Sequence, residues 1–370
     1  GKKLDIHQHT DRAVIDWRSF NINVDEHTQF HQPSSSAVAL NRVSSADPSH
    51  IMGKLSANGN VILINPNGVF FGKDSKVDVN GLIATTADID NDAFMVDDLL
   101  HFNKSGKADA AIINAGHITA KEAGLVALVA PNVANHGIIE AKMGRVELAS
   151  GDSVMADLYG DGLYELKVSD GVASQIVSNT GSITAEGGTI AITAAAGKEI
   201  VNSLVTIKGE LKAPSVSQKN GKIIIGAAGS NAVKGNRDED KGKKQGSSNV
   251  VIADAYLDVS GRKAGESGGS IEITGDNVAL LNGTLIDASG HTGKSGTIKD
   301  KKISDAREGS AGGDIKIGGD YLGQGDAATA RKVAELNGLS RSQLPLEIGQ
   351  FYQTLSADPV QLKKFTEYWE

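Results

Sequence analysis

Short apolar runs separated by turn-forming residues recur along most of the chain. The runs are rich in Val and Ile, and the residues between them are mostly Gly, Asn, Asp and Ser. Branched side chains fit a pleated surface and small polar residues favour turns, so this alternation is typical of short strands. The pattern therefore predicts an all-β protein with many small turns.

Three segments repeat one another in sequence. Each contains an Asn, a Gly two residues later and an Ile two residues after that; they are INAGHITA, VANHGIIEA and VSNTGSITA, which begin at positions 113, 133 and 177. Asn114 and Asn135 are 21 residues apart, and Asn135 and Asn179 are 44 apart, which we interpret as two further periods. A period near 21 with three short strands predicts a right-handed parallel β-helix, in which each coil lies about 4.8 Å above the last.

Two other motifs recur later in the chain. YLDVSG at 256–261 returns as LIDASG at 285–290, and GGSIEITG at 268–275 returns as GGDIKIGG at 312–319. A β-sandwich is the main alternative, but sandwiches rarely repeat the same turn at a regular spacing. The stretch between positions 60 and 325 would supply roughly a dozen coils at this rise, with aliphatic side chains stacked inside.

We therefore place the β-helix at residues 56–326, with three departures from its pattern. Residues 1–55 alternate polar and apolar positions and carry larger aromatic residues, which predicts an N-terminal β cap over the open end. Residues 230–249 are charged and Gly-rich, which predicts a solvated loop within the helix. Residues 327–370 show Leu, Glu, Lys and Gln at helical spacing, which predicts a short C-terminal helical segment of unknown role.

The composition excludes several classes of function. The net charge of −8 disfavours nucleic acid as a partner, because phosphate binding requires a basic face. Cysteine is absent, and the histidine pairs His7 with His9 and His27 with His31 complete no recognised ligand pattern, so we expect no metal and no cofactor. No apolar run reaches the ~20 residues that a transmembrane helix needs.

A long, ordered series of motifs resembles a known family. RAVIDWRSFNI, TQFHQPSSSAVALNRV and GKLSANGNVILINPNGVFFGKDSKVDVNGLIATTADI follow one another over residues 12–89. Together they resemble the N-terminal secretion domain of two-partner secretion exoproteins, the filamentous haemagglutinin-like adhesins of Gram-negative bacteria. Residues 65–67 match the family's Asn-Pro-Asn motif, and Asn41 and Arg42 belong to its Leu-Asn-Arg-Val stretch.

The resemblance implies an export module and not an enzyme. It implies that the unfolded exoprotein is recognised in the periplasm by the POTRA-type domains of an outer-membrane β-barrel transporter. The chain would then fold outside as a monomeric β-helix, secreted or held at the cell surface, where a host cell surface is a further candidate partner. The lack of cysteine and the low content of proline and aromatic residues are consistent with threading of an extended chain.

One tetrapeptide of this series separates the apolar runs VILI and VFFG. Pro66 fixes φ and lacks an amide N–H, so it cannot continue a central strand. Asn65 and Asn67 can bond to local backbone groups, and Gly68 tolerates a positive φ. We therefore expect a tight turn with a structural role; the alternative is a recognition signal that the transporter contacts. The residues assigned to this structural motif are Asn65, Pro66, Asn67, Gly68, Asn41 and Arg42.

Two other functions remain as alternatives. Some parallel β-helices are polysaccharide lyases or hydrolases, which need clustered acids on one face. Asp258 and Asp287 recur at equivalent turns and could stack as neighbours, but Asp near Ser-Gly is also a common turn choice, so we expect no catalytic residues. The second alternative is an adhesin module in which the rod itself binds host glycans or receptors.

Overall fold

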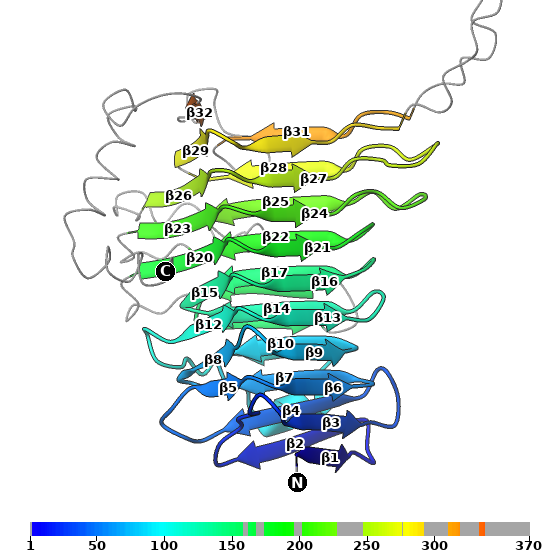
Figure 1. Ribbon diagram of the computed structural model, residues 1–370. Coiled ribbons are helices and arrows are strands. Elements are labelled where there is room, and N and C mark those ends of the chain that lie inside the picture. Colours follow the sequence, from blue (N-terminus) through cyan, green and yellow to red (C-terminus); the bar gives the residue numbers. More distant parts are fainter. Residues whose placement is uncertain are drawn as a thin grey trace, which may run out of the picture.

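The computed structural model forms a rod in which three long sheets run side by side along the axis (Figure 1). The strands stack from β1 at the N-terminal end of the rod to β31 near the opposite end. The residues that the structure describes are 2–157, 162–167, 174–195, 202–227, 247–275, 277–291, 310–318 and 333–336.

Sheets A, B and C form the walls of the rod. Sheet A contains β1 (Lys3–His7), β3 (His27–His31), β6 (Lys54–Ala57), β9 (Lys76–Val79), β13 (His117–Ala120), β16 (Ile138–Ala141), β21 (Ser182–Thr184), β24 (Glu210–Lys212), β27 (Tyr256–Asp258) and β30 (Leu285–Asp287). Sheet B contains β2 (Arg12–Trp17), β4 (Val38–Val43), β7 (Asn60–Ile64), β10 (Gly81–Thr85), β14 (Leu125–Ala130), β17 (Arg145–Ser150), β22 (Thr189–Ala194), β25 (Lys222–Ala227), β28 (Ser270–Thr274) and β31 (Asp314–Ile317). Sheet C contains β5 (Ser49–Ile51), β8 (Gly68–Phe71), β12 (Ala111–Asn114), β15 (Asn132–Asn135), β20 (Ser174–Asn179), β23 (Asn202–Ile207), β26 (Ser247–Ile252), β29 (Asn277–Leu281) and β32 (Val333–Leu336).

The chain visits these sheets in a fixed order. From β3 onward, each coil passes through sheet A, sheet B and sheet C and then returns to sheet A one rung higher, whereas the first coil has strands only in sheets A and B. Every strand pair within these sheets is parallel. Neighbouring rungs are in register, so equivalent residues of successive coils lie directly above one another. The predicted all-β fold of the parallel β-helix type is confirmed.

The interior of the rod is filled by columns of aliphatic side chains. From β6 to β27, one residue from each rung of sheet A stacks on its equivalent below, and all of these side chains are buried. In chain order this column contains Leu55, Val77, Ile118, Ile139, Ile183, Leu211 and Leu257. Burial of each such side chain contributes about 1.5–3 kcal/mol, so the columns are the main source of cohesion between coils.

An additional layer covers part of sheet B from outside. It consists of α1 (Asn91–Val96) and an antiparallel sheet of β11 (Leu99–Phe102), β18 (Ser153–Asp157) and β19 (Gly162–Lys167). The apolar side chains of α1, β11 and β18 form a second core with the outward-facing residues of β4, β7, β10 and β14. These strands are therefore buried on both faces, which explains why VILI and LVALVA are continuous apolar runs and not alternating ones.

The repeats of the sequence map onto successive rungs, with one correction. Asn114 pairs with Asn135, the strand with YLD pairs with that containing LID, and the two Gly-Gly motifs begin neighbouring strands of sheet B. Asn135 and Asn179, however, also lie in adjacent rungs, so our interpretation of their spacing as two periods was wrong. The extra residues form β18 and the outer layer instead of another coil. Between residues 60 and 325, sheet B contains eight described strands, β7 to β31, fewer than the dozen coils expected for that stretch.

The boundaries predicted for the cap and the loop can be compared with the described residues only in part. Strands β1 to β4, from the segment assigned to the cap, form the first rungs of sheets A and B, and a separate capping role stays a prediction. Residues 230–246 of the predicted loop lie outside the described residues. The last positions of that prediction, 247–249, belong to β26.

The predicted C-terminal helical segment lies almost entirely outside the described residues. Its one described part, Val333–Leu336, is the strand β32 and not a helix. This strand continues sheet C by pairing in parallel with β29, with Val333 opposite Val278 and Leu336 opposite Leu281. Within the described part of the chain, no helix is long and apolar enough to cross a membrane.

Candidate functional site

The tetrapeptide of residues 65–68 connects β7 in sheet B to β8 in sheet C. The amide of Gly68 donates to the carbonyl oxygen of Asn65 at 2.9 Å, which closes a four-residue turn. The amide of Asn67 donates to the Asn65 side-chain oxygen, also at 2.9 Å. Gly68 has a φ of 110°, a conformation that side-chain-bearing residues rarely adopt.

The two asparagine side chains of this turn bind the coil below. The Asn65 amide group is buried and donates to the carbonyl oxygen of Asp47 at 3.1 Å and to the hydroxyl of Ser49 at 3.0 Å. The Asn67 amide group donates to the carbonyl oxygen of Ser45 at 2.7 Å. Both side chains therefore fix the segment that leads into β5.

The same turn also contacts the coil above. The amide of Lys107 donates to the carbonyl oxygen of Pro66 at 2.9 Å, and the amide of Asn65 donates to Thr85 at 3.1 Å. A Cβ atom on Gly68 would overlap the carbonyl oxygen of Ala111 in the next rung. The turn is thus enclosed between two neighbouring coils and held by hydrogen bonds to both.

Asn41 lies in β4 and faces the interior of the rod. Its side-chain oxygen accepts a hydrogen bond from Trp17 Nε1 at 2.9 Å, and its amide nitrogen donates to the carbonyl oxygens of Ala39 and Ile62. The side chain is fully buried, so these bonds satisfy a polar group that would otherwise be costly in the core. Asn41 connects β4 to the strand on either side of it in sheet B.

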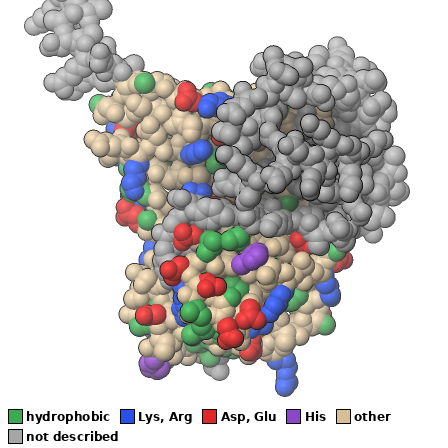
Figure 2. All heavy atoms as spheres, turned by 180° about the vertical axis from the view of Figure 1, so that it is seen from behind, with side chains coloured by type: hydrophobic (Ala, Val, Ile, Leu, Met, Phe, Trp, Pro, Cys, Tyr) green, Lys and Arg blue, Asp and Glu red, His purple; other side chains and the backbone are tan. Residues whose placement is uncertain are grey.

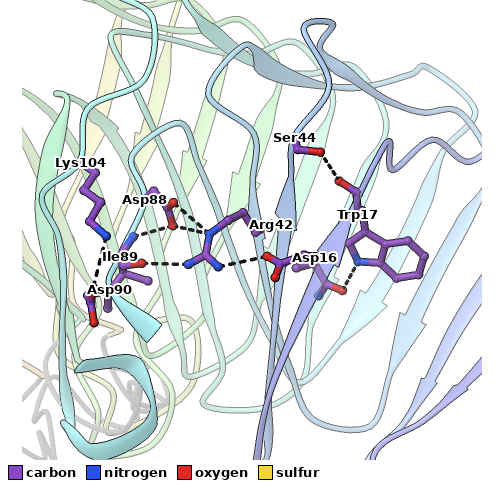
Figure 3. Close-up of polar contacts among 9 residues, drawn as sticks. Asp16, Trp17, Arg42, Ser44, Asp88, Ile89, Asp90 and Lys104 are labelled. Carbon is purple, nitrogen blue, oxygen red and sulfur yellow. Dashed lines mark hydrogen bonds and ion pairs between the residues drawn. The ribbon is translucent and has the colours of Figure 1, made fainter. Parts of the chain in front are cut away.

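Arg42, the next residue, points outward and anchors the start of the outer layer (Figure 3). Its Nε donates to both carboxylate oxygens of Asp88 at 2.9 Å, and its two Nη atoms donate to Asp16 at 3.1 Å and to the carbonyl oxygen of Ile89 at 2.9 Å. Burial acts to lower the pKa of Arg42, but the hydrogen bonds to Asp88 and Asp16 outweigh it and raise the pKa above its ordinary value. The side chain therefore stays charged and ties three segments of the chain together.

The segment beyond Asp88 leads into α1. The Asp90 side chain accepts the amide of Asp92 as the helix N-cap and forms an ion pair with Lys104 at 3.4 Å (Figure 3). The hydrogen bond from Asp92, followed by that from Lys104, holds the pKa of Asp90 below its ordinary value.

Figure 2 shows the back of the rod, where exposed hydrophobic and acidic side chains gather in its N-terminal half.

The two motifs that the sequence singled out are neighbours in space. Arg42 pairs with Ile64 in the register of β4 and β7, and Ile64 directly precedes the turn at Asn65. Sequence reasoning did not identify Trp17 and Asp88 as their partners. Both lie inside the motif series that carried the family resemblance, but only the coil register shows that they contact Asn41 and Arg42.

The two aspartates weighed as candidate acids lie in adjacent rungs, at the ends of β27 and β30. Asp258 accepts hydrogen bonds from the amide and hydroxyl of Ser260 and from Arg262 at 2.6 Å, and Asp287 accepts the amide of Ser289 at 2.9 Å. Burial raises the pKa of Asp258, but these hydrogen bonds outweigh it and leave the pKa below its ordinary value. Both carboxylates therefore close local turns. No cluster of three or more metal-binding side chains occurs among the described residues.

Comparison with known proteins identifies the family. The model of the TPS secretion domain family matches residues 1–237. The chain belongs to the TPS secretion domain family. The crystal structure of the HMW1 secretion domain from Haemophilus influenzae is similar to it, with a TM-score of 0.69 and 30% sequence identity. That similarity covers 92% of this chain and 77% of the other.

Two curated relatives are heme/hemopexin-binding proteins of Haemophilus influenzae. One, from strain Rd, is 35% identical over 234 residues, which cover 61% of this chain and 25% of the relative. The other is 33% identical over 248 residues and is covered to 26%. The chain therefore spans about a quarter of the length of the curated relatives that it matches.

Membership in this family fixes the cellular route in outline. TPS secretion domains belong to exoproteins that cross the outer membrane with a cognate transporter and are secreted or remain at the cell surface. The predicted function as a secretion domain and the predicted secreted or cell-surface localisation are therefore confirmed. The family is one of secretion domains and not of enzymes.

Proposed function

We propose that this chain is the N-terminal secretion domain of a larger exoprotein and that the POTRA-type periplasmic domains of its transporter recognise it before it folds. The family match over residues 1–237 is the observation that carries this proposal. The contacts of the helix support it, because each strand of sheets A, B and C pairs only with the coils directly below and above it. A monomeric rod of this kind can fold coil by coil as it emerges outside the cell, without a separate energy source.

We infer that Asn65, Asn67, Asn41 and Arg42 act in export by holding the first coils together. Asn65 and Asn41 are fully buried, which leaves little of either side chain for a transporter to contact in the folded state. Their hydrogen bonds run to neighbouring coils, and Arg42 ties β2 and β4 to the outer layer. Loss of export after their substitution would then follow from failed folding on the outer surface.

The test uses a secretion reporter that carries this domain together with its transporter. Asn65→Ala removes a buried donor from two acceptors, so we expect the free energy of unfolding of the purified domain to fall by about 2–4 kcal/mol. We expect the amount of secreted reporter to fall in parallel. Asn103→Ala, at an exposed position, is the matched control and should change neither quantity.

The two roles of the motif give different results in this experiment. If Asn65→Ala and Asn67→Ala block secretion while thermal unfolding of the purified domain is unchanged, the motif is a contact signal and the structural role is wrong. If the transporter's periplasmic domains do not bind the unfolded chain at all, the proposed recognition step fails independently of the motif.

A further inference from the structure

The outer layer exposes apolar side chains where α1 ends and β11 begins. Met95, Val96 and Leu99 have exposed fractions of 49%, 77% and 40%. They are three of the eight large hydrophobic residues that are exposed in the described part of the chain, and they lie within five positions of one another. Exposed apolar surface is therefore concentrated in this one short segment. We call these three residues the apolar patch.

The packing of α1 does not require the apolar patch. The buried residue of this helix is Phe94, which belongs to the outer core, and Ala93 packs beside that core. Met95 and Val96 are exposed, at positions where a surface helix normally carries polar residues. Grouped apolar side chains on a protein surface often mark a site of interaction, which single scattered ones do not.

The segment that presents the apolar patch is fixed at both ends of α1. At its start, the Asp90 side chain accepts the amide of Asp92. At its end, Arg12 of β2 donates to the carbonyl oxygens of Phe94 and Asp97, both at 2.6 Å. The Arg12 guanidinium also lies 5.8 Å from the centre of the Phe94 ring. The patch is therefore held in one position, so a partner that binds it loses little affinity to the ordering of this segment.

Acidic side chains accompany the apolar patch. Residues 88–99 contain five aspartates and no basic residue. Asp92, Asp97 and Asp98 are exposed, and Figure 2 shows acidic and hydrophobic side chains together in the N-terminal half of this side of the rod. The basic side chains that bond to the segment are Arg12, Arg42 and Lys104. Five aspartates against three basic side chains leave the surface with a net negative charge.

The combination of apolar and acidic groups restricts what can bind here. The aspartates would repel an anionic membrane or a nucleic acid. A second copy related by a twofold axis would place its own aspartates against these, because such an interface joins identical patches. A partner that carries apolar side chains between lysines or arginines is complementary to both parts of the surface.

We propose that the apolar patch, together with Asp92, Asp97 and Asp98, is a docking site for a cationic amphipathic segment of a partner protein. The apolar side chains of the partner lie on the patch, where the flexible thioether of Met95 adapts to their shape. The flanking basic side chains pair with the aspartates. Because the patch is small, the complex is weak and transient, and salt weakens it further. The surface belongs to the folded rod, so this inference does not depend on how the transporter recognises the chain.

The test measures binding of a labelled helical peptide to the full chain by fluorescence anisotropy. The probe contains only Leu and Lys, with Leu at positions i, i+3, i+4 and i+7 so that one face is apolar. We expect saturable binding that weakens as the salt concentration increases. Two control peptides should bind at least about tenfold more weakly. One has Glu in place of every Lys, and the other has the same residues in an order that spreads Leu around the helix.

Two double variants separate the apolar contribution from that of charge. Met95→Gln/Val96→Gln removes two apolar side chains, and Asp97→Asn/Asp98→Asn removes two charges. Each should weaken binding of the Leu and Lys peptide by about tenfold or more. Both variants should fold, because Gln favours a helix at least as well as Val and the two aspartate side chains are exposed. Circular dichroism checks the fold of each variant.

The matched control is Val24→Gln/Asp74→Asn, which changes an exposed apolar residue and an exposed aspartate elsewhere on the rod and should bind like the original chain. Equal affinity of the control and the patch variants would overturn the proposal, because the peptide would then respond only to the net charge of the chain. Equal binding of the Glu-containing peptide would overturn it too. If Met95→Gln/Val96→Gln instead abolishes binding to phosphatidylcholine vesicles or dissociates a dimer in sedimentation, the occupant is a membrane or a second copy and the proposal is wrong.

Discussion

At the scale of single residues, buried asparagines connect the coils. The Asn114 side chain donates to the side-chain oxygen of Asn135 at 2.8 Å, and Asn135 donates in turn to Asn179 at 2.7 Å. All three side chains are completely buried at the corner between sheets C and A. Each amide satisfies its neighbour, so the ladder avoids the cost of unpaired polar groups in the core and requires the same residue in successive rungs.

Asn135→Ala should therefore destabilise the protein more than the loss of one side chain suggests. It leaves the Asn114 donor and the Asn179 acceptor without their partner, and we expect the free energy of unfolding to fall by about 2–4 kcal/mol. Asn132→Ala, in the same strand, removes two long hydrogen bonds of 3.4 Å from a half-buried side chain and should cost less. Urea denaturation of both variants checks this, and equal costs would show that the ladder adds nothing to strand pairing.

At the scale of elements, the turn between β7 and β8 shows why a glycine is required at one position. Gly68 combines a φ of 110° with close approach to the carbonyl oxygen of Ala111. Gly265 also has a positive φ, of 90°, but a Cβ atom there would meet no other atom within 4 Å. A comparison of substitutions at these two glycines therefore distinguishes the cost of backbone strain from the cost of steric overlap between coils.

Gly68→Ala should cost more stability than Gly265→Ala. Both substitutions place a side chain at a positive φ, which costs about 1–2 kcal/mol, and Gly68→Ala must in addition push the rungs of β8 and β12 apart. We expect a clearly larger decrease in melting temperature for Gly68→Ala and a lower yield of secreted reporter for that variant alone. The steric argument is wrong if both variants melt at the same temperature.

At the scale of the whole molecule, the rod has two hydrophobic cores that share sheet B. Phe71 belongs to the interior core, and Phe102 belongs to the outer core between sheet B and the outer layer; both are completely buried. The outer layer is assembled from strands β11 and β18, which are about fifty residues apart in the chain. We therefore expect the outer core to close later than the coils that it covers, while each coil can pair as soon as it forms.

Phe102→Ala should loosen the outer layer and leave the coils intact. Truncation of a buried phenylalanine side chain to Ala lowers the free energy of unfolding by about 3–5 kcal/mol. Here the lost contacts lie in the outer core, between sheet B and the outer layer. We expect faster hydrogen exchange in α1, β11 and β18, with protection retained in sheets A and C. Phe71→Ala should instead raise exchange in the rungs around β8. Uniform loss of protection in both variants would mean that the two cores unfold as one unit.

Much of this architecture could be predicted from the sequence because the interactions that define it are local and repeated. Asn114 and Asn135 stack one coil apart, and that spacing is visible in the chain. The turn at Asn65 was predictable because Pro66 and Gly68 restrict the backbone whatever surrounds them. The spacing to Asn179 was misinterpreted because an excursion and an additional coil add similar numbers of residues.

The sequence by itself determined the strand type, the turn positions and the aliphatic interior, since these follow from side-chain shape and backbone restriction within a few residues. Only the tertiary structure decided which coils are neighbours, that Arg42 meets Asp88 and Asp16, and that the outer layer covers sheet B. These contacts join residues far apart in the chain, and their geometry is set by the register of the rungs and not by any local preference.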